Sequence, residues 1–179
     1  MILCSNPAQL QDLFGDLSAF CDAFPFRPRT KRKITGMNAP RSLVQTFLVT
    51  YPNHPLIGFY QSLLFRHAFA YYFIAYVVGD DITYRHELCH WYYHISASYR
   101  RYWNGMWHQL SPGLQKWFLS WLQKQGYGSR VMVDEFQAYL RTEPRQTWFT
   151  NMPPIYQKEF KFVLQEVLCT FELMFTPRS

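Results

Sequence analysis

The chain has 179 residues, of which 49% are hydrophobic, 20% aromatic and only 17% charged. This composition excludes a disordered or fibrous protein, and the length excludes two large domains. The formal net charge is +6, and one short cluster holds five of the positive charges: Arg27, Arg29, Lys31, Arg32 and Lys33. Flanked by prolines, such a cluster is typical of a solvated linker and makes nucleic acid an unfavoured partner.

The first expected element is a helix that begins at Pro7, after Asn6 as its N-cap, and ends near Cys21. Residues 22–41 contain several prolines and the basic cluster, and they predict an irregular arm. We therefore expect an N-terminal helix and basic arm over residues 1–41 and a second region over residues 42–179, joined in a single globular unit.

Helical patterns dominate the rest of the chain. Residues 42–51 are compatible with a strand or a short helix, and residues 55–79 predict a buried helix that allows a strand at its distal end. Four further patterns predict one long helix from Asp81 past Trp103 and later helices at residues 112–126, 131–140 and 153–175. The expected fold is mainly α, with α+β allowed through a small sheet.

The expected localisation follows from three absences in the sequence. The longest apolar run, residues 68–78, is much shorter than the roughly 20 residues that span a bilayer, so we expect no membrane span. The N-terminus has no basic region before an apolar stretch, and the four cysteines form no C-x-x-C pair. A reducing, cytoplasmic location is the expectation.

The most informative motif is H-E-x-x-H, which reads His86, Glu87, Leu88, Cys89 and His90. On a helix, positions i and i+4 lie about 40° apart, so both imidazoles can approach one ion. Glu87 is displaced by about 100°, where it can meet a metal-bound water. This spacing predicts a Zn²⁺ site with His86 and His90 as ligands and Glu87 as the catalytic base.

A third ligand has to come from elsewhere in the chain. His94 lies too far along the helix from His86, Cys89 is expected to face the core, and the longer metzincin motif fails at Tyr93 and Ala97. Glu135 stands out downstream because apolar neighbours surround it on a predicted helix, and a buried carboxylate is costly unless it is paired or bound to metal.

The two segments together resemble the gluzincin-type zinc metallopeptidases. In these enzymes a glutamate of a later helix, often within E-x-x-A-[DN], joins the H-E-x-x-H histidines, and here residues 135–139 read E-F-Q-A-Y. The resemblance covers residues 56–141, and the short chain is similar to the compact minigluzincins. It implies a zincin-like fold and Glu135 as third zinc ligand. Where many such families place Asp or Asn to orient a zinc histidine, this chain has Tyr139, so the orienting group would be Tyr139, Asp134 or a residue that the sequence does not identify.

The resemblance implies hydrolysis of a protein or peptide by zinc-activated water, with Glu87 as general base. A helper for the developing oxyanion is also expected, and five side chains are chemically able: Tyr99, His108, Tyr127, Arg130 and Tyr139. The N-terminal helix and arm are a candidate inhibitory segment across the cleft. The oligomeric state has no sequence signal.

Two alternatives stay open. An inactive, peptidase-like interaction module would keep the metal site without catalysis, although the presence of Glu87 favours catalysis. A nucleic-acid-binding protein would use residues 27–33 with the flanking Phe24 and Phe26, and its binding would weaken steeply with salt.

Overall fold

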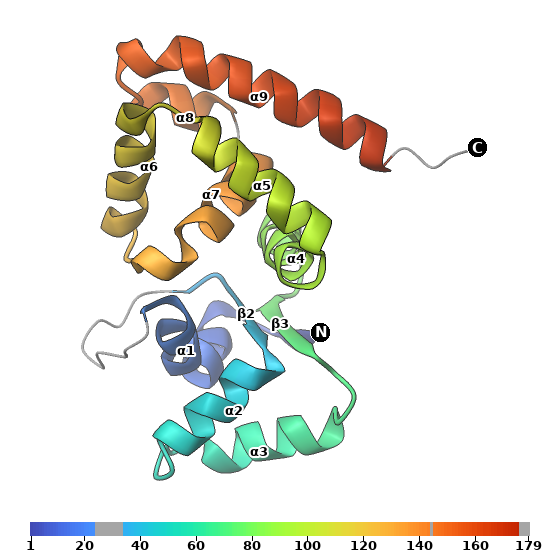
Figure 1. Cartoon of the computed structure of the whole chain (residues 1–179). Coiled ribbons are helices and arrows are strands. Elements are labelled where there is room, and N and C mark those ends of the chain that lie inside the picture. The colour runs from blue at the N-terminus through green and yellow to red at the C-terminus, as the bar shows by residue number, and fades with distance from the viewer. Residues whose placement is uncertain (24–33, 144, 176–179) are drawn as a thin grey trace.

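The computed structural model describes residues 1–23, 34–143 and 145–175 (Figure 1). Within these ranges the chain forms nine α-helices, one 3₁₀ turn and one three-stranded sheet. The prediction of a mainly α fold with a small sheet is confirmed. The basic cluster and its flanking phenylalanines lie outside the described residues, so the nucleic-acid alternative stays a prediction.

The sheet consists of β1 (Ile2–Cys4), β2 (Gly36–Pro40) and β3 (Tyr72–Val77), in the order β1-β3-β2. β1 runs parallel to the central β3, whereas β2 pairs with β3 in antiparallel fashion. The strand order therefore leaves β2 at one edge of the sheet.

The prediction of an irregular arm up to residue 41 is wrong for residues 36–40, which form β2. Met37 and Ala39 are buried, whereas Gly36, Asn38 and Pro40 are half-buried, and this alternation is typical of a strand. The strand was not predicted because its pattern spans only five residues, which include a glycine and a proline. Truncation of residues 1–40 would thus remove two of the three strands of the sheet.

Three helices cover the sheet region: α1 (Pro7–Ala23), α2 (Arg41–Thr50) and α3 (Ile57–Arg66). The Asn6 cap of α1 is confirmed, since its Oδ1 accepts the backbone N–H of Gln9 at 2.9 Å. Residues 42–51, left open between strand and helix, form most of α2. Over residues 55–79 the predicted helix is shorter than the full segment, because α3 ends at Arg66, and the strand allowed at its distal end is confirmed as β3.

The helix predicted from Asp81 past Trp103 is also wrong, because two helices form there: α4 (Asp81–Ile95) and α5 (Ala97–Gln109). Ser96 interrupts them in an extended conformation and caps α5, with its Oγ accepting the N–H of Tyr99 at 3.3 Å. The turn into α4 requires Gly79, whose φ is +85°.

The remaining helices are α6 (Pro112–Lys124), α7 (Met132–Thr142), α8 (Arg145–Asn151) and α9 (Pro154–Phe175). Three of them lie where the sequence predicted helices, whereas α8 was not predicted. No helix of the described residues is long and apolar enough to cross a membrane.

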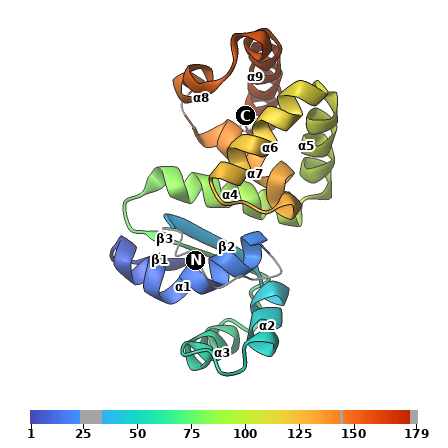
Figure 2. The ribbon, with the colours of Figure 1, turned by 90° about the vertical axis from the view of Figure 1, so that its left-hand side faces the viewer.

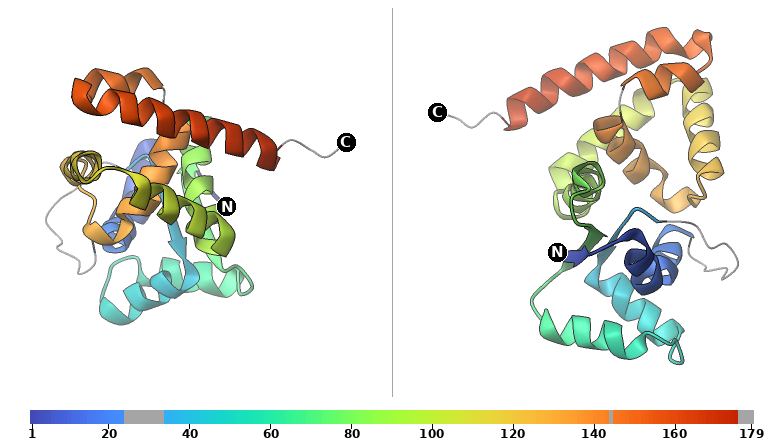
Figure 3. Two further views of the ribbon diagram at one scale, coloured as in Figure 1. Left: turned by 45° about the horizontal axis from the view of Figure 1, so that its top comes forward. Right: turned by 180° about the vertical axis from the view of Figure 1, so that it is seen from behind.

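α4 lies between the sheet with α1 to α3 and the other helices, as Figure 2 shows, and each of these two parts has its own hydrophobic core. The first contains buried residues from Cys4 to Ala75, between the sheet and α1 to α3. The second contains buried residues from Tyr99 to Val167, within the helical part that Figure 3 shows from two further sides. The predicted boundary at residue 41 falls within the first core. α4 therefore presents its side chains where the two parts meet.

Candidate metal centre

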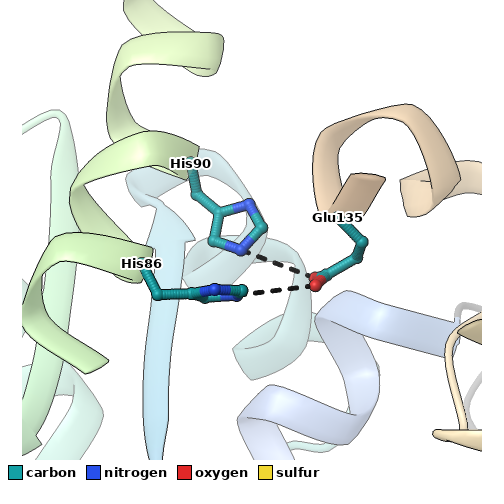
Figure 4. Close-up of side chains that lie close together, drawn as sticks. All are labelled: His86, His90 and Glu135. Carbon is teal, nitrogen blue, oxygen red and sulfur yellow. Dashed lines mark ion pairs between the residues drawn. The ribbon is translucent and has the colours of Figure 1, made fainter. Parts of the chain in front are cut away.

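The three predicted metal ligands come together between α4 and α7 (Figure 4). His86 and His90 lie one turn apart on α4, and Glu135 lies in the first turn of α7, which packs against α4. His90 and Glu135 are buried and His86 is half-buried. The candidate ligand atoms of the three residues all lie within 4.8 Å of one another.

The separation of these atoms fits a zinc ion better than direct hydrogen bonds. His86 Nε2 lies 3.6 Å from Glu135 Oε2, and His90 Nε2 lies 3.6 Å from Glu135 Oε1. Hydrogen bonds of this kind are shorter, at about 2.7–3.2 Å. Ligands that hold one zinc tetrahedrally at about 2.0–2.2 Å lie about 3.3–3.6 Å apart. Two imidazoles and a carboxylate are also a donor set that zinc accepts.

Each histidine is oriented through its other ring nitrogen. His90 Nδ1 lies 2.8 Å from Asp134 Oδ1, which can only accept, so Nδ1 carries a proton in this contact. His86 Nδ1 lies 3.1 Å from Thr142 Oγ1, whose hydroxyl donates to the carbonyl of Ala138. Both Nε2 atoms therefore face Glu135 with the geometry of metal ligands.

Electrostatics of the site favour a bound cation. Burial, and then the neighbouring His90, lower the pKa of His86 to about 4, which keeps its imidazole neutral near pH 7. Burial also opposes the charged form of His90, but the carboxylates of Asp134 and Glu135 outweigh it and hold the pKa of His90 well above its usual range. Two carboxylates thus stabilise positive charge beside the Nε2 atoms.

Glu87 lies on the β2 side of α4 and is only 5% exposed. Its Oε2 accepts a hydrogen bond of 2.6 Å from Asn38 Nδ2, and the Oδ1 of Asn38 accepts one from the hydroxyl of Tyr72. Burial raises the pKa of Glu87, although both histidines and the Asn38 hydrogen bond act in the opposite direction. A carboxylate with a raised pKa is a better proton acceptor than an ordinary glutamate.

Gly36 lies directly against Glu87. A Cβ atom at position 36 would lie 2.3 Å from Glu87 Oε1 and 2.5 Å from the methyl group of Thr83. No side chain fits in that space, so the glycine lets β2 approach the carboxylate closely.

One cavity of about 130 Å³ contains Glu87 and all three candidate ligands in its wall. Ser18 of α1 and residues 34–38 also line it, so the N-terminal part of the chain borders the site. Whether this part inhibits activity stays a prediction.

The five candidate oxyanion helpers occupy different places. Tyr127 and Tyr139 line the cavity, and their hydroxyls lie 2.9 Å apart. The other three are not among the described residues that line the cavity. The hydroxyl of Tyr99 donates a hydrogen bond to Gln137, and His108 and Arg130 are exposed.

The remaining sequence expectations concern Cys89 and His94. Cys89 is buried at 4% exposure, as expected for a core residue, and is absent from the ligand group. His94 is exposed, and its ring lies tilted against that of Tyr72, with the ring centres 5.0 Å apart.

Three supporting residues were not predicted: Asn38, Tyr72 and Thr142. Thr142 had a signal, because it follows Glu135 by seven residues and so shares its helix face. Asn38 and Tyr72 had none, since they reach Glu87 only through the pairing of β2 with β3. Of the two orienting groups that the resemblance implied, Asp134 contacts His90, whereas Tyr139 packs its ring against His86 with centres 4.7 Å apart.

Comparison of the chain with family models, curated proteins and solved structures finds no match.

Asp134→Asn should weaken zinc binding by about 10- to 100-fold, because an amide orients His90 less strongly than a carboxylate and adds no negative charge. Competition titration with a chromophoric chelator measures the affinity. The matched control is Asp12→Asn, an exposed carboxylate of α1 that lines no part of the cavity. Equal affinities of both variants and the wild type would contradict the role of Asp134.

Proposed function

We propose that the chain is a zinc-dependent peptidase, with zinc held by His86, His90 and Glu135. The observation that carries the proposal is the buried carboxylate of Glu87 in the same cavity as the three candidate ligands. When bound, zinc would supply an acidified water, with a pKa near about 7, and would polarise the scissile carbonyl.

In this proposal Glu87 accepts the proton of the attacking water and then passes it to the leaving amine. Asn38 holds Oε2 of Glu87 at 2.6 Å, and Gly36 leaves space for Oε1, so the carboxylate has a fixed direction. The hydroxyls of Tyr127 and Tyr139, which lie in the cavity wall, are the candidate donors to the developing oxyanion.

The position of β2 supports an extended peptide as substrate. β2 forms an edge of the sheet, and its residues 36–38 line the cavity next to Glu87. An edge strand offers backbone N–H and C=O groups to a second extended chain. A peptide bound along β2 would bring one of its carbonyls to the site.

The proposal is tested by incubating the zinc-loaded protein with a mixture of unrelated peptides and identifying products by mass spectrometry. We expect cleavage that a chelator removes and added zinc restores. A protein that holds zinc but cleaves none of the peptides would contradict the proposal and favour the inactive interaction module.

Gly36→Ala should lower kcat by about 10- to 100-fold with zinc still bound, because the new Cβ displaces Glu87 from its position. The matched control is Gly58→Ala, since a Cβ at Gly58 in α3 meets nothing within 4 Å. Steady-state kinetics and zinc content are measured for both variants. If Gly36→Ala were as active as Gly58→Ala, the close approach of β2 would have no catalytic role.

A further inference from the structure

A second cavity of about 250 Å³ adjoins the candidate metal centre. Its described wall comes from α6, α7, α8 and their connections, and consists of Trp117, Trp121, Gln125, Tyr139, Glu143, Trp148 and Asn151. Tyr139 and Glu143 also line the metal cavity, so the two cavities share a wall. We call this second cavity the aromatic pocket.

Three of its aromatic rings stand at steep angles to one another. The Trp121 and Tyr139 rings make an angle of 90° with centres 5.1 Å apart, and Tyr139 and Trp148 make one of 87° at 6.5 Å. Trp121 and Trp148 meet at 53° with centres 5.0 Å apart. The two edge-to-face contacts of Tyr139 and the tilted contact between the tryptophans hold the rings in place. Trp117 adds a fourth aromatic side chain to the wall.

The charge of the aromatic pocket has one source among the described wall residues, the carboxylate of Glu143. No ion pair joins it to any described residue. Glu143 is the C-cap residue that directly follows α7, and it lines the pocket together with Tyr139 of α7. Aromatic faces attract a cation, and a carboxylate beside them adds to that attraction.

The size of the pocket indicates what it holds. At about 250 Å³ it lies below the roughly 300–1,000 Å³ typical of sites for whole small molecules, yet it is far larger than one water requires. A single long side chain is the matching occupant.

We propose that the aromatic pocket binds the basic side chain, lysine or arginine, of a peptide residue next to the scissile bond. The inference rests on the proposed peptidase function and adds its specificity. The Tyr139 ring contacts both the imidazole of His86 and the ring of Trp121, and Tyr139 lines both cavities, so the pocket lies beside the candidate zinc ligands. In this proposal, the side chain one residue from the reacting carbonyl occupies the pocket.

The first test measures kcat/KM for a set of peptides that differ only in the residues flanking the cleaved bond. Lysine is compared with norleucine, which has the same straight chain without the charge. We expect the lysine or arginine peptide to be preferred by about five- to thirtyfold at one flanking position. The ratio of the two kcat/KM values is the readout, because it does not depend on the overall activity of a variant.

Two variants address the two parts of the pocket. Glu143→Gln should reduce the ratio to within about threefold of one, and Trp117→Leu should reduce it by removing an aromatic wall. Asp12→Asn removes the same charge as Glu143→Gln from an exposed site of α1 and should keep the wild-type ratio. Circular dichroism checks that each variant folds. A preference for norleucine, or a lysine preference that Glu143→Gln leaves intact, would overturn the proposal.

A second measurement separates the pocket from catalysis. The indole ¹⁵N–¹H signals of zinc-loaded protein are followed by NMR during titration with N-acetyl-lysine N-methylamide and with its norleucine analogue. We expect the lysine probe to shift signals of the pocket tryptophans more, and Glu143→Gln to abolish the difference. If no peptide is cleaved, the peptidase function fails, while equal responses to both probes would overturn the basic-side-chain pocket itself.

Discussion

Replacement of Glu87 by glutamine will lower kcat for peptide hydrolysis by about 100- to 10,000-fold, because the amide cannot accept the proton of the attacking water. The side chain keeps its size, and its carbonyl oxygen can still accept the hydrogen bond from Asn38. Zinc will therefore stay bound. Steady-state kinetics and zinc content are measured on the same preparation.

Glu166→Gln is the matched control for this substitution. Glu166 is an exposed residue of α9 and lines neither the metal cavity nor the aromatic pocket. We expect wild-type kinetics for it. A Glu87→Gln variant with kcat within threefold of the wild type would show that another group accepts the proton.

Glu135→Ala will weaken zinc binding by more than the roughly 10- to 100-fold expected for a supporting residue such as Asp134. The substitution removes a ligand and one of the two carboxylates that stabilise positive charge beside His90. Thermal unfolding with and without zinc gives an independent reading. Free zinc at 100 times its Kd stabilises the wild type by about 2.7 kcal/mol, and this gain should vanish in the variant at the same concentration.

The metal-free forms provide the control for this second prediction. Alanine removes a buried carboxylate that is costly without a cation, so the metal-free variant should be at least as stable as the metal-free wild type. A zinc-dependent stabilisation equal to that of the wild type would show that Glu135 is not a ligand.

The extent of sequence-based prediction differed between the helices and the strands. Helix periodicity and caps identified most helices, and the i, i+4 spacing of the two histidines identified one face of α4. The break at Ser96 was not predicted, because a serine within an apolar and aromatic run is compatible with a helix interior. The extended backbone of Ser96 in the structure reveals the break. β2 was not predicted, because its alternation spans only five residues. The strand gains its stability from pairing with β3.

The residues of the candidate site also differ in whether a local sequence pattern predicted them. Local sequence signals predicted that His86 and His90 share one face of α4 and that Glu135 is buried, and the structure brings these residues together with Glu87. Asn38 and Tyr72 could not be predicted as site residues from the sequence, because long-range strand pairing brings them to Glu87 and no local pattern encodes that pairing. The aromatic pocket likewise forms only when α6, α7 and α8 pack together.

The zinc content of the wild-type chain is the decisive measurement for the proposed metal centre. Protein purified without an affinity tag is dialysed against metal-free buffer, incubated with zinc, desalted and examined by elemental analysis. We expect about one zinc per chain, with no comparable zinc in Glu135→Ala treated in the same way. A folded wild-type protein that retains no zinc after this treatment would contradict the metal centre and, with it, the proposed peptidase function.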